Sequence, residues 1–433
     1  MPNGNKLAKS SLAVAFNSYL FLKFLGIFLP IYWVLVWLAR PPIRKYWLLI
    51  ASFTFWVYAG NDHFRNLIFI SVSLIGNYLI YYFLTRKKSP QAIWSAILLN
   101  LGILFYYSSF FFHYVLRPFL YENDNVIPFW PLGIAFYSLS FIQFHSDLIR
   151  QNKMGPVSKT DFILFGSFFP VSNAGPIPRW RELQEKFSGN LPAFYSSLLK
   201  GSAWILLGLI KKTYLAELLF EYSESVFKTP YSYAPSALWI AFYVNAAQLY
   251  LDFSGYVDMG RGAARLFGYR LPRNFISPFF SKSIREVLFS WNRTLAVFFR
   301  GTVYPICKKA NILPWVSFGF VCVSYSLWYL FSWEGFLFSA FLFSFLWIEK
   351  RIPIRISPRW IGSVIRILLT FHCIGIVFTL IRFPKWNSWL GYWKAFGGEG
   401  TGTLDDYGLF AIVIIGITIG IQLLERKFKR FFL

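Results

Sequence analysis

The stretch FNSYLFLKFLGIFLPIYWVLVWL, residues 16–38, decides the fold class of this chain. Its side chains are almost all apolar, and Lys23 is the one charged residue in it. An α-helix needs about 20 mostly apolar residues to cross the hydrocarbon core of a bilayer. The stretch reaches that length and exceeds the short apolar region of a cleavable signal peptide. It therefore predicts a membrane-spanning helix.

Similar apolar runs recur along the whole chain, at residues 46–59, 66–84, 92–116, 127–149, 195–220, 235–251, 313–348, 361–381 and 409–424. The composition agrees, since 56% of the residues are hydrophobic and 14% are charged, against about a quarter charged in soluble proteins. The shorter runs predict re-entrant or buried helices. We expect an all-α polytopic membrane protein with about ten to twelve transmembrane and re-entrant helices.

The net charge of +24 does not indicate a nucleic-acid partner, because the basic residues gather in alternate loops. Those loops are residues 40–45, 86–88 and 150–153, whereas the loops between them, 61–65 and 117–126, carry acidic residues. Positively charged loops stay on the cytoplasmic side of a membrane. The alternation thus predicts a multi-pass protein of the plasma membrane, with the basic tail at residues 426–430 in the cytoplasm.

No polar linker, low-complexity tract or fixed-period repeat divides the chain. We therefore expect one membrane domain at 1–433, with N-terminal spans at 1–150, a motif region at 151–350 and C-terminal spans at 351–433. Three scattered cysteines and four histidines form no metal-binding spacing, so no bound cofactor is expected. Paired interrupted spans in two halves are absent, which disfavours a transporter.

Two segments of the motif region carry charged residues beside apolar runs. In QLYLDFSGYVDMG, residues 248–260, the spacing of Asp252 and Asp258 does not place both carboxylates on one helical face, so a paired acid and base is disfavoured. We expect ion pairs with Arg261 and Arg265 instead, because carboxylates near a membrane are costly unless partnered.

In FFPVSNAGPIPRW, residues 168–180, Arg179 follows a Gly-Pro turn, and Arg181 lies one residue beyond the segment. We expect these two residues to meet phosphates, more often those of lipid headgroups than those of a donor.

Two further segments contain the polar residues that are candidates for catalysis. In SKSIREVLFSWNRTLAVFFRGTVY, residues 281–304, Ser283 and Glu286 form a capping box that predicts a helix starting at Ile284. Asn292 in the same segment must be hydrogen-bonded in or beside a membrane, to a neighbouring helix or to a substrate carbonyl. The fourth segment is SLWYLFSWEGF, residues 326–336.

Four segments resemble, in the same order, motifs of the membrane-bound O-acyltransferase (MBOAT) family. They are GIAFYSLSFIQFHSDLIR, FFPVSNAGPIPRW, YLDFSGYVDMGRGAARLFGYRLPRNF and SWNRTLAVFFRGTVY. The resemblance covers nearly the whole chain. It is closest to the bacterial branch, which contains the alginate O-acetyltransferases and the D-alanyl transfer proteins of teichoic acid modification.

The resemblance implies a bundle of about 10–12 helices around a central funnel, in the bacterial inner membrane. It implies transfer of an acyl group, acetyl first of all, from acyl-CoA or an acyl carrier to a hydroxyl of a cell-surface polysaccharide or lipid. The lipid bilayer, the acyl donor and the acceptor are the expected partners, with an extracytoplasmic accessory protein as a further one and no nucleic acid.

The family's chemistry rests on a late histidine, read as a general base, and on an earlier histidine or asparagine. In this chain Asn292 stands at the earlier position and Tyr329 at the later one, in LWYLFSW where the family reads LWHG. Their separation, 329 − 292 = 37 residues, fits the lipid-modifying members. Asn292 and Tyr329 are thus the candidate catalytic residues. The candidate substrate-binding residues are Arg179, Asp252, Ser254, Asp258, Trp291, Trp328 and Glu334.

Whether the chain is an enzyme is left open by Tyr329, because a phenol titrates near pH 10 and is a poor base at neutral pH. Asn292 and backbone groups would polarise the acyl carbonyl, with Tyr329 or a water in proton transfer. The first alternative is an inactive pseudo-acyltransferase that binds donor, acceptor or a partner; the second is a transporter or flippase.

Simple packing competes with catalysis for several of these residues. Tyr329 would then be a packed aromatic residue and Glu334 a cap or ion-pair partner. His145 and His372 stand in spans, where we expect both to be hydrogen-bonded rather than catalytic.

Overall fold

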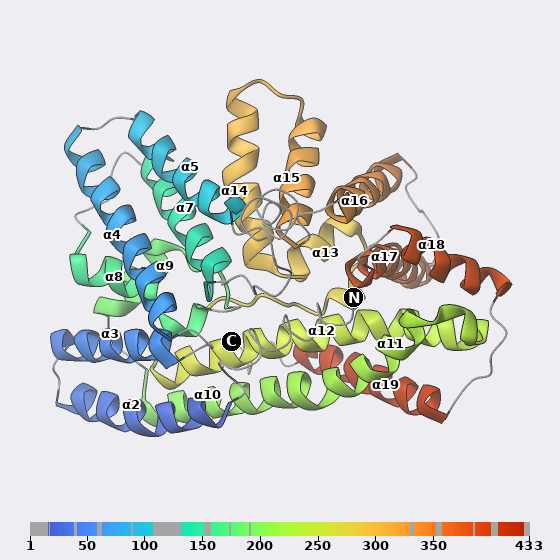
Figure 1. Cartoon of the computed structure of the whole chain (residues 1–433), viewed down its shortest axis with the longest axis horizontal. Helices are drawn as coiled ribbons and strands as arrows, with labels where there is room; N and C mark the ends of the chain where they lie inside the picture. The colour runs from blue at the N-terminus through green and yellow to red at the C-terminus, as the bar shows by residue number, and fades with distance from the viewer. Residues whose placement is uncertain are drawn as a thin grey trace, which may run out of the picture. The chain divides into compact units, whose positions relative to one another are not determined.

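The structure is a computed structural model that describes residues 16, 18–38, 41–58, 63–87, 90–106, 131–150, 157–172, 175–189, 192–329, 333–351, 357–383, 386–399 and 406–427. Every regular element among these residues is helical (Figure 1). The expected all-α class is confirmed. The helices cluster in two compact units. The prediction of a single membrane domain stays a prediction.

Unit 1 comprises residues 1–208 and 256–272. Its elements are α2 (Tyr19–Trp37), α3 (Pro41–Tyr58), α4 (His63–Lys87), α5 (Pro90–Tyr106), α7 (Ile134–Arg150), α8 (Lys159–Ser167), η2 (Phe169–Val171), α9 (Trp180–Ser188), nearly all of α10 (Phe194–Leu209) and the end of α12 (Pro235–Leu266). Helix α5 packs against both α4 and α7, and α8 packs against α3 (Figure 1).

Aromatic side chains fill the core of unit 1. Phe162 of α8 stacks on Phe141 of α7, with ring centroids 5.7 Å apart, and meets Phe144 edge-on at 5.2 Å. Trp180, the first residue of α9, packs edge-on against Phe144 at 5.4 Å. Such ring pairs stabilise a core beyond the area that they bury. Much of the high aromatic content thus serves the interior of the helix bundle.

Helices α10 and α12 approach each other closely at two glycines of unit 1. A Cβ atom added at Gly201 would lie 2.7 Å from the side chain of Leu266, and one at Gly262 would lie 2.7 Å from that of Ile205. Small residues let helices in membranes bring their backbones together. Gly201 and Gly262 therefore set the separation of the two helices in this unit.

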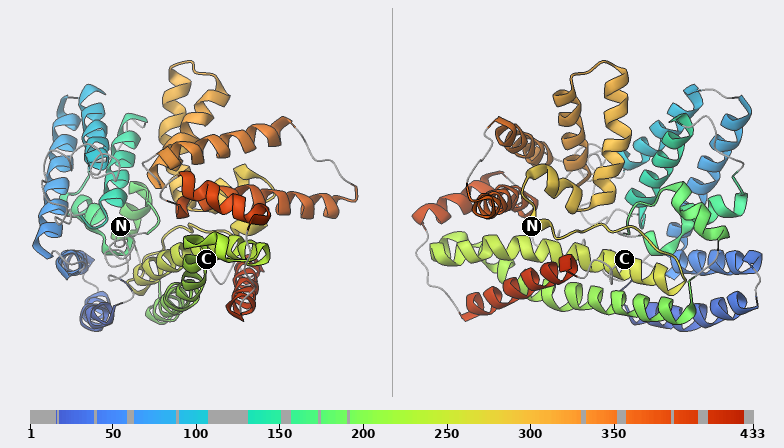
Figure 2. Two further views of the ribbon diagram at one scale, coloured as in Figure 1. Left: turned by 45° about the vertical axis from the view of Figure 1, so that its right-hand side comes forward. Right: turned by 180° about the vertical axis from the view of Figure 1, so that it is seen from behind.

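Unit 2 comprises residues 209–255 and 273–433. Its elements are the π-helical turn η3 (Ile210–Ala216), α11 (Glu217–Lys228), η4 (Pro230–Ser232), the larger part of α12, η5 (Pro278–Phe280), α13 (Ile284–Ser290), α14 (Arg293–Lys309), α15 (Pro314–Tyr329), α16 (Trp333–Arg351), α17 (Arg359–Arg382), α18 (Trp386–Lys394), η6 (Ala395–Glu399) and α19 (Asp406–Lys427). Helix α15 packs between α14 and α16 (Figure 2).

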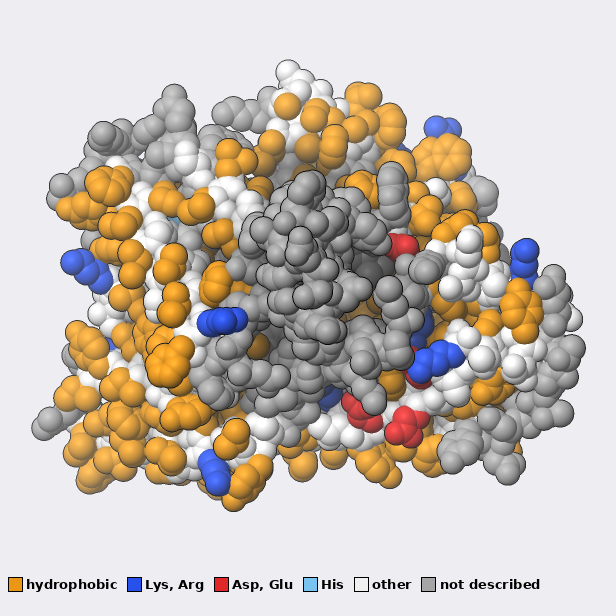
Figure 3. Space-filling model, in the orientation of Figure 1, with side chains coloured by type: hydrophobic (Ala, Val, Ile, Leu, Met, Phe, Trp, Pro, Cys, Tyr) orange, Lys and Arg blue, Asp and Glu red, His pale blue; other side chains and the backbone are white. Residues whose placement is uncertain are grey.

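The described residues contain four helices that are long and apolar enough to cross a membrane. These segments are Tyr19–Trp37, Phe64–Phe83, Arg359–Arg382 and Gly408–Lys427. Hydrophobic side chains cover much of the visible surface, with few charged groups among them (Figure 3). The class of polytopic membrane protein is confirmed. The larger number of spans expected from the apolar runs stays a prediction.

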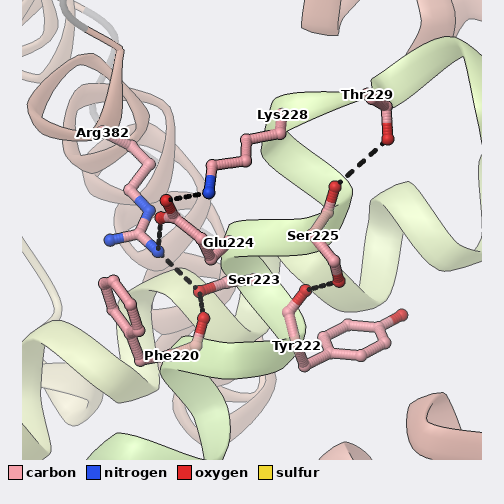
Figure 4. A network of polar contacts seen from close by, with 8 residues as sticks. All are labelled: Phe220, Tyr222, Ser223, Glu224, Ser225, Lys228, Thr229 and Arg382. Atoms are coloured by element: carbon pink, nitrogen blue, oxygen red, sulfur yellow. Dashed lines mark hydrogen bonds and ion pairs between the residues drawn. The ribbon is translucent and has the colours of Figure 1, made fainter. Parts of the chain in front are cut away.

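The positive charge of Arg382, at the end of α17, is neutralised by an acidic side chain of α11. Arg382 lies 3.1 Å from the carboxylate of Glu224 on α11 and donates a hydrogen bond to Ser223 (Figure 4). Lys228 contacts the same carboxylate at 2.9 Å. The Arg382 guanidinium also lies over the ring of Phe220, 4.4 Å from its centroid. Helix α11 thus supplies the partners that a charge near a membrane requires.

Candidate functional site

Asn292 lies at the turn between α13 and α14. Its backbone is left-handed, with φ 47° and ψ 54°, and its side chain is buried. Asparagine is one of the few residues besides glycine that tolerate this conformation. The side-chain Oδ1 accepts a hydrogen bond of 2.9 Å from Asn274 Nδ2. The expectation that Asn292 is hydrogen-bonded is confirmed, with a partner from the loop before α13.

Asn274 anchors this turn and was not predicted. Its Oδ1 accepts hydrogen bonds from the backbone N–H of Thr294 at 2.9 Å and from the Thr294 hydroxyl at 2.6 Å. Its carbonyl oxygen accepts a third, from the Arg293 N–H at 2.8 Å. Asn274 is itself buried, so these bonds are shielded from water. The side chain therefore fixes both the orientation of Asn292 and the first turn of α14.

The loop that carries Asn274 is held in turn by α19. Ser277 donates a hydrogen bond to the backbone carbonyl of Gln422 at 2.8 Å, and the Phe279 N–H donates to the Gln422 side chain at 3.1 Å. Gln422 is buried. The last described helix of the chain thus contacts the loop that positions Asn292.

Helix α13 begins at Ile284, as predicted. The Ser283 hydroxyl accepts a hydrogen bond from the Glu286 N–H at 3.0 Å, which is the expected cap. Glu349 of α16 accepts a second bond, of 2.9 Å, from the Ile284 N–H. Burial raises the pKa of the Glu349 carboxyl group. Two of the free N–H groups at the start of α13 are therefore satisfied by side chains.

Trp291 directly follows α13 as its C-cap and is buried in apolar surroundings. Its ring lies 5.2 Å from that of Phe275 and 4.6 Å from that of Phe378 on α17. Its backbone carbonyl accepts a hydrogen bond of 3.0 Å from the hydroxyl of Tyr325 on α15. This bond brings α15 to the turn that carries Asn292. The predicted contact of Trp291 with substrate stays a prediction.

Tyr329 is the last residue of α15, four residues beyond Tyr325. Each helical residue advances about 1.5 Å, so its backbone lies about 6 Å further along the axis than that of Tyr325. The Tyr329 side chain lies outside the described part of the structure, and its role stays a prediction. Nearby, Trp328 is half-buried, and Glu334 lies in the first turn of α16.

A small apolar cavity lies beside Trp291, with a volume of about 10 Å³. It is lined by α12, η5, α13 and α17, through residues that include Phe279, Phe371 and Phe378. This volume is about that of one water molecule. The central funnel stays a prediction.

Asp258 and Asp252 of the motif DFSGYVDMG have different partners. Asp258 is buried and lies 3.7 Å from Arg261, one helical turn further on, as expected. Asp252 instead contacts Lys212, with Nζ 2.6 Å from its carboxylate. Its predicted pairing with Arg261 or Arg265 is wrong, because the π-helical turn η3 directs Lys212 toward this part of α12.

Ser254 and Arg179 were also predicted to contact substrate. Ser254 is buried, and its hydroxyl has no hydrogen-bond partner among the described residues. Arg179 is exposed and immediately precedes α9. Substrate binding by either residue stays a prediction.

The turn η3 also buries Lys211, which was not predicted as a site residue. Its Nζ lies 2.6 Å from Glu425 of α19, and the Tyr250 hydroxyl donates to the other oxygen of this carboxylate at 2.9 Å. The signals in the sequence were two adjacent lysines within an apolar run and a lone acid in the basic tail. The two lysines of η3 therefore connect α12 and α19.

Both histidines that were expected to be hydrogen-bonded are so. His145 Nε2 lies 2.9 Å from the Asn77 side chain in unit 1. In unit 2, His372 Nδ1 lies 2.7 Å from the Leu368 carbonyl oxygen, and its Nε2 lies 3.0 Å from the Tyr243 hydroxyl. A carbonyl oxygen can only accept, so Nδ1 of His372 donates the hydrogen bond to Leu368.

Curated proteins match most of this chain, although no protein-family model does. A probable alginate O-acetylase, AlgI, of Pseudomonas syringae pv. tomato is 28% identical over 377 residues, which cover 83% of this chain and 71% of the relative. A peptidoglycan O-acetyltransferase of Helicobacter pylori is 28% identical over 325 residues, 65% of this chain and 60% of the relative. A teichoic acid D-alanyltransferase of Streptococcus thermophilus is 22% identical over 287 residues, 58% and 67%.

These relatives share one class of activity, the transfer of acyl groups. They are MBOAT proteins, so the resemblance carried by the four sequence segments is confirmed. The chain resembles the bacterial branch of that family along most of its length.

Proposed function

We propose that this protein transfers an acyl group from a thioester donor to a hydroxyl of a cell-surface polysaccharide, with acetyl as the preferred candidate for the acyl group. The observation that carries the proposal is the match to an alginate O-acetylase over 83% of the chain. Relatives named for peptidoglycan and teichoic acid support a polymeric acceptor. The donor would be acyl-CoA or an acyl carrier, and the setting the bacterial inner membrane, with the basic tail in the cytoplasm.

In the proposed reaction the acceptor oxygen attacks the thioester carbonyl. A carbon–oxygen bond forms, the carbon–sulfur bond breaks, and the thiol leaves with the proton lost by the hydroxyl. The amide of Asn292 would donate to the carbonyl oxygen as it gains negative charge. Asn274 supports this role because it holds the Asn292 side chain before substrate arrives. A donor fixed in this way is worth about 10²–10³ in rate.

Tyr329 or a water would carry the proton, as a weak base. An extracytoplasmic accessory protein would complete delivery to the polymer. The candidates for substrate contact are parts of the same proposal: Arg179, Asp252, Ser254, Asp258, Trp291, Trp328 and Glu334.

Deletion and complementation in the host cell test the function with any accessory protein present at its natural level. The measured quantity is the acetate that mild alkali releases from purified cell-surface polysaccharide. Wild type should restore the ester, whereas Asn292→Gly, which keeps the left-handed backbone but removes the amide, should lower it about a hundredfold. Asn311→Gly is the matched control, since Asn311 is also left-handed, with φ 55°, but exposed.

The outcome that overturns the proposal is unchanged polysaccharide esterification after deletion. Tyr329→Phe and Tyr329→His distinguish catalysis from packing. If only the histidine variant restores esters to the deleted strain, the native chain is a pseudo-acyltransferase.

A further inference from the structure

Four basic residues of unit 1 lie on neighbouring segments and are here called the basic cluster: Arg44, Lys186, Arg265 and Arg270. Arg44 of α3 donates a hydrogen bond of 2.7 Å to the carbonyl oxygen of Gly189, just after α9. Lys186 of α9 donates one of 2.7 Å to the carbonyl oxygen of Arg270. Arg265 at the end of α12 lies on the same turn as Arg270, because the Gly268 N–H donates a hydrogen bond of 2.9 Å to the Arg265 carbonyl oxygen. The loop after α12 and the end of α9 thus join the four residues.

Two guanidinium groups of the basic cluster are buried without full hydrogen bonding. Arg44 and Arg265 are only 6% and 5% exposed. Within the described residues, Nε of Arg44 and Nη1 of Arg265 have no hydrogen-bond partner. The hydrogen bond from Arg265 Nη2 to the Ser196 hydroxyl is a long one, at 3.4 Å. Buried N–H groups of this kind normally have an acceptor, so both retain an unused capacity to donate.

Neighbouring acids do not neutralise the basic cluster. Asp161 is occupied by Lys45, whose Nζ lies 2.8 Å from its carboxylate. Glu182 and Glu185 of α9 act on Lys186 without forming a salt bridge to it in the described structure. Among the described residues, no carboxylate forms an ion pair with any member of the cluster. The cluster therefore keeps a net positive charge.

The positive charges of the basic cluster also repel one another. Arg265 lies beyond the apolar run 235–251. Burial lowers the pKa of its guanidinium, and the neighbouring charge of Arg270 lowers it further. Burial lowers the pKa of Lys186 as well, and Arg270 acts in the same direction, although Glu182 and Glu185 oppose it. A bound anion would offset both the free-energy cost of burying these charges and their mutual repulsion.

We propose that the basic cluster binds a phosphate group. The planar fork of a guanidinium group donates paired hydrogen bonds that match phosphate oxygens, and two such groups are already held in place here. Phosphate can come from two sources: the pantetheine phosphate of an acyl donor, or the headgroup of an anionic phospholipid. The first source rests on the proposed function, whereas phosphate binding itself does not. Both sources are present at the cytoplasmic side, where the loop at residues 40–45 is expected.

Binding by the purified full chain in phosphatidylcholine nanodiscs tests the proposal without any transfer reaction. The probes are coenzyme A, 4′-phosphopantetheine and pantetheine, which lacks phosphate, measured by calorimetry. The variants are Arg265→Gln and Arg270→Gln, of which the second changes an exposed residue and should fold normally. Lys159→Gln is the matched control, since it removes one positive charge from an exposed position of the same unit.

Wild type should bind the two phosphorylated probes and not pantetheine if the donor is the source. Each arginine variant should then weaken binding about tenfold or more, while Lys159→Gln stays within about twofold. If the headgroup is the source, nanodiscs with phosphatidylglycerol should raise the unfolding temperature of wild type but not of Arg265→Gln. Equal behaviour of wild type and both arginine variants toward every phosphate probe would overturn the proposal. If the wild-type protein binds phosphate but transfers no acyl group, that result counts against the proposed function alone.

Discussion

Replacement of Asn274 by alanine should loosen the turn that carries Asn292. The change removes three hydrogen bonds made by the Asn274 side chain, one to Asn292 and two from Thr294. A buried polar group that loses its partner costs about 1–3 kcal/mol. Asn292 and Thr294 keep further interactions, so the losses are not additive. We expect Asn274→Ala to lower the free energy of unfolding by about 2–4 kcal/mol.

Asn245 provides a matched control within the same unit. It is also a buried asparagine, 1% exposed, yet neither side-chain atom of its amide has a hydrogen-bond partner among the described residues. Truncation to alanine therefore breaks no described hydrogen bond and removes an amide that is costly to bury. We expect Asn245→Ala to leave the free energy of unfolding unchanged or to raise it slightly.

The assay is reversible unfolding of each purified variant in mixed micelles, followed by circular dichroism as sodium dodecyl sulfate is added. Equal destabilisation by Asn274→Ala and Asn245→Ala would show that amide burial, and not the hydrogen-bonded anchor, governs stability here. The argument for a preorganised Asn292 would then fail.

Two further changes test the packing of the helices. Lys211→Met should lower the free energy of unfolding by about 3–5 kcal/mol, because it leaves the Glu425 carboxylate without its buried cation. Adding Glu425→Leu to this variant should recover most of the lost stability. If the double variant recovers no stability, the pairing is refuted. Gly262→Ala should cost about 1–3 kcal/mol, because its Cβ would lie 2.7 Å from Ile205. Gly416→Ala, with nothing within 4 Å, is its control, and equal stability of the two variants in the same assay would contradict a close crossing.

The helical class could be read from the sequence because it depends on local features. The apolar run at 16–38 is long enough to span a bilayer whatever surrounds it, and α2 occupies Tyr19–Trp37. The start of α13 was predictable for the same reason, since Ser283 and Glu286 satisfy the cap within one turn. Such features do not depend on distant neighbours.

The partners in the candidate site could not be predicted because they come from segments far apart in the sequence. Tyr325 reaches the Trp291 carbonyl from another helix, and no local pattern marks that contact. The pairing of Asp252 was predicted wrongly because an unforeseen π-helical turn brings Lys212 to it. Asn274 stood within a segment that resembles the acyltransferases, and its position among charged and aromatic residues was the one available signal.

The contacts of Gln422 have a practical consequence for work on this protein. Gln422 of α19 accepts hydrogen bonds from Ser277 and Phe279 in the loop that orients Asn292. We therefore expect a fluorescent or affinity fusion attached after α19 to disturb the position of Asn292. Reporters are better placed elsewhere, so that a silent fusion is not mistaken for a protein without activity.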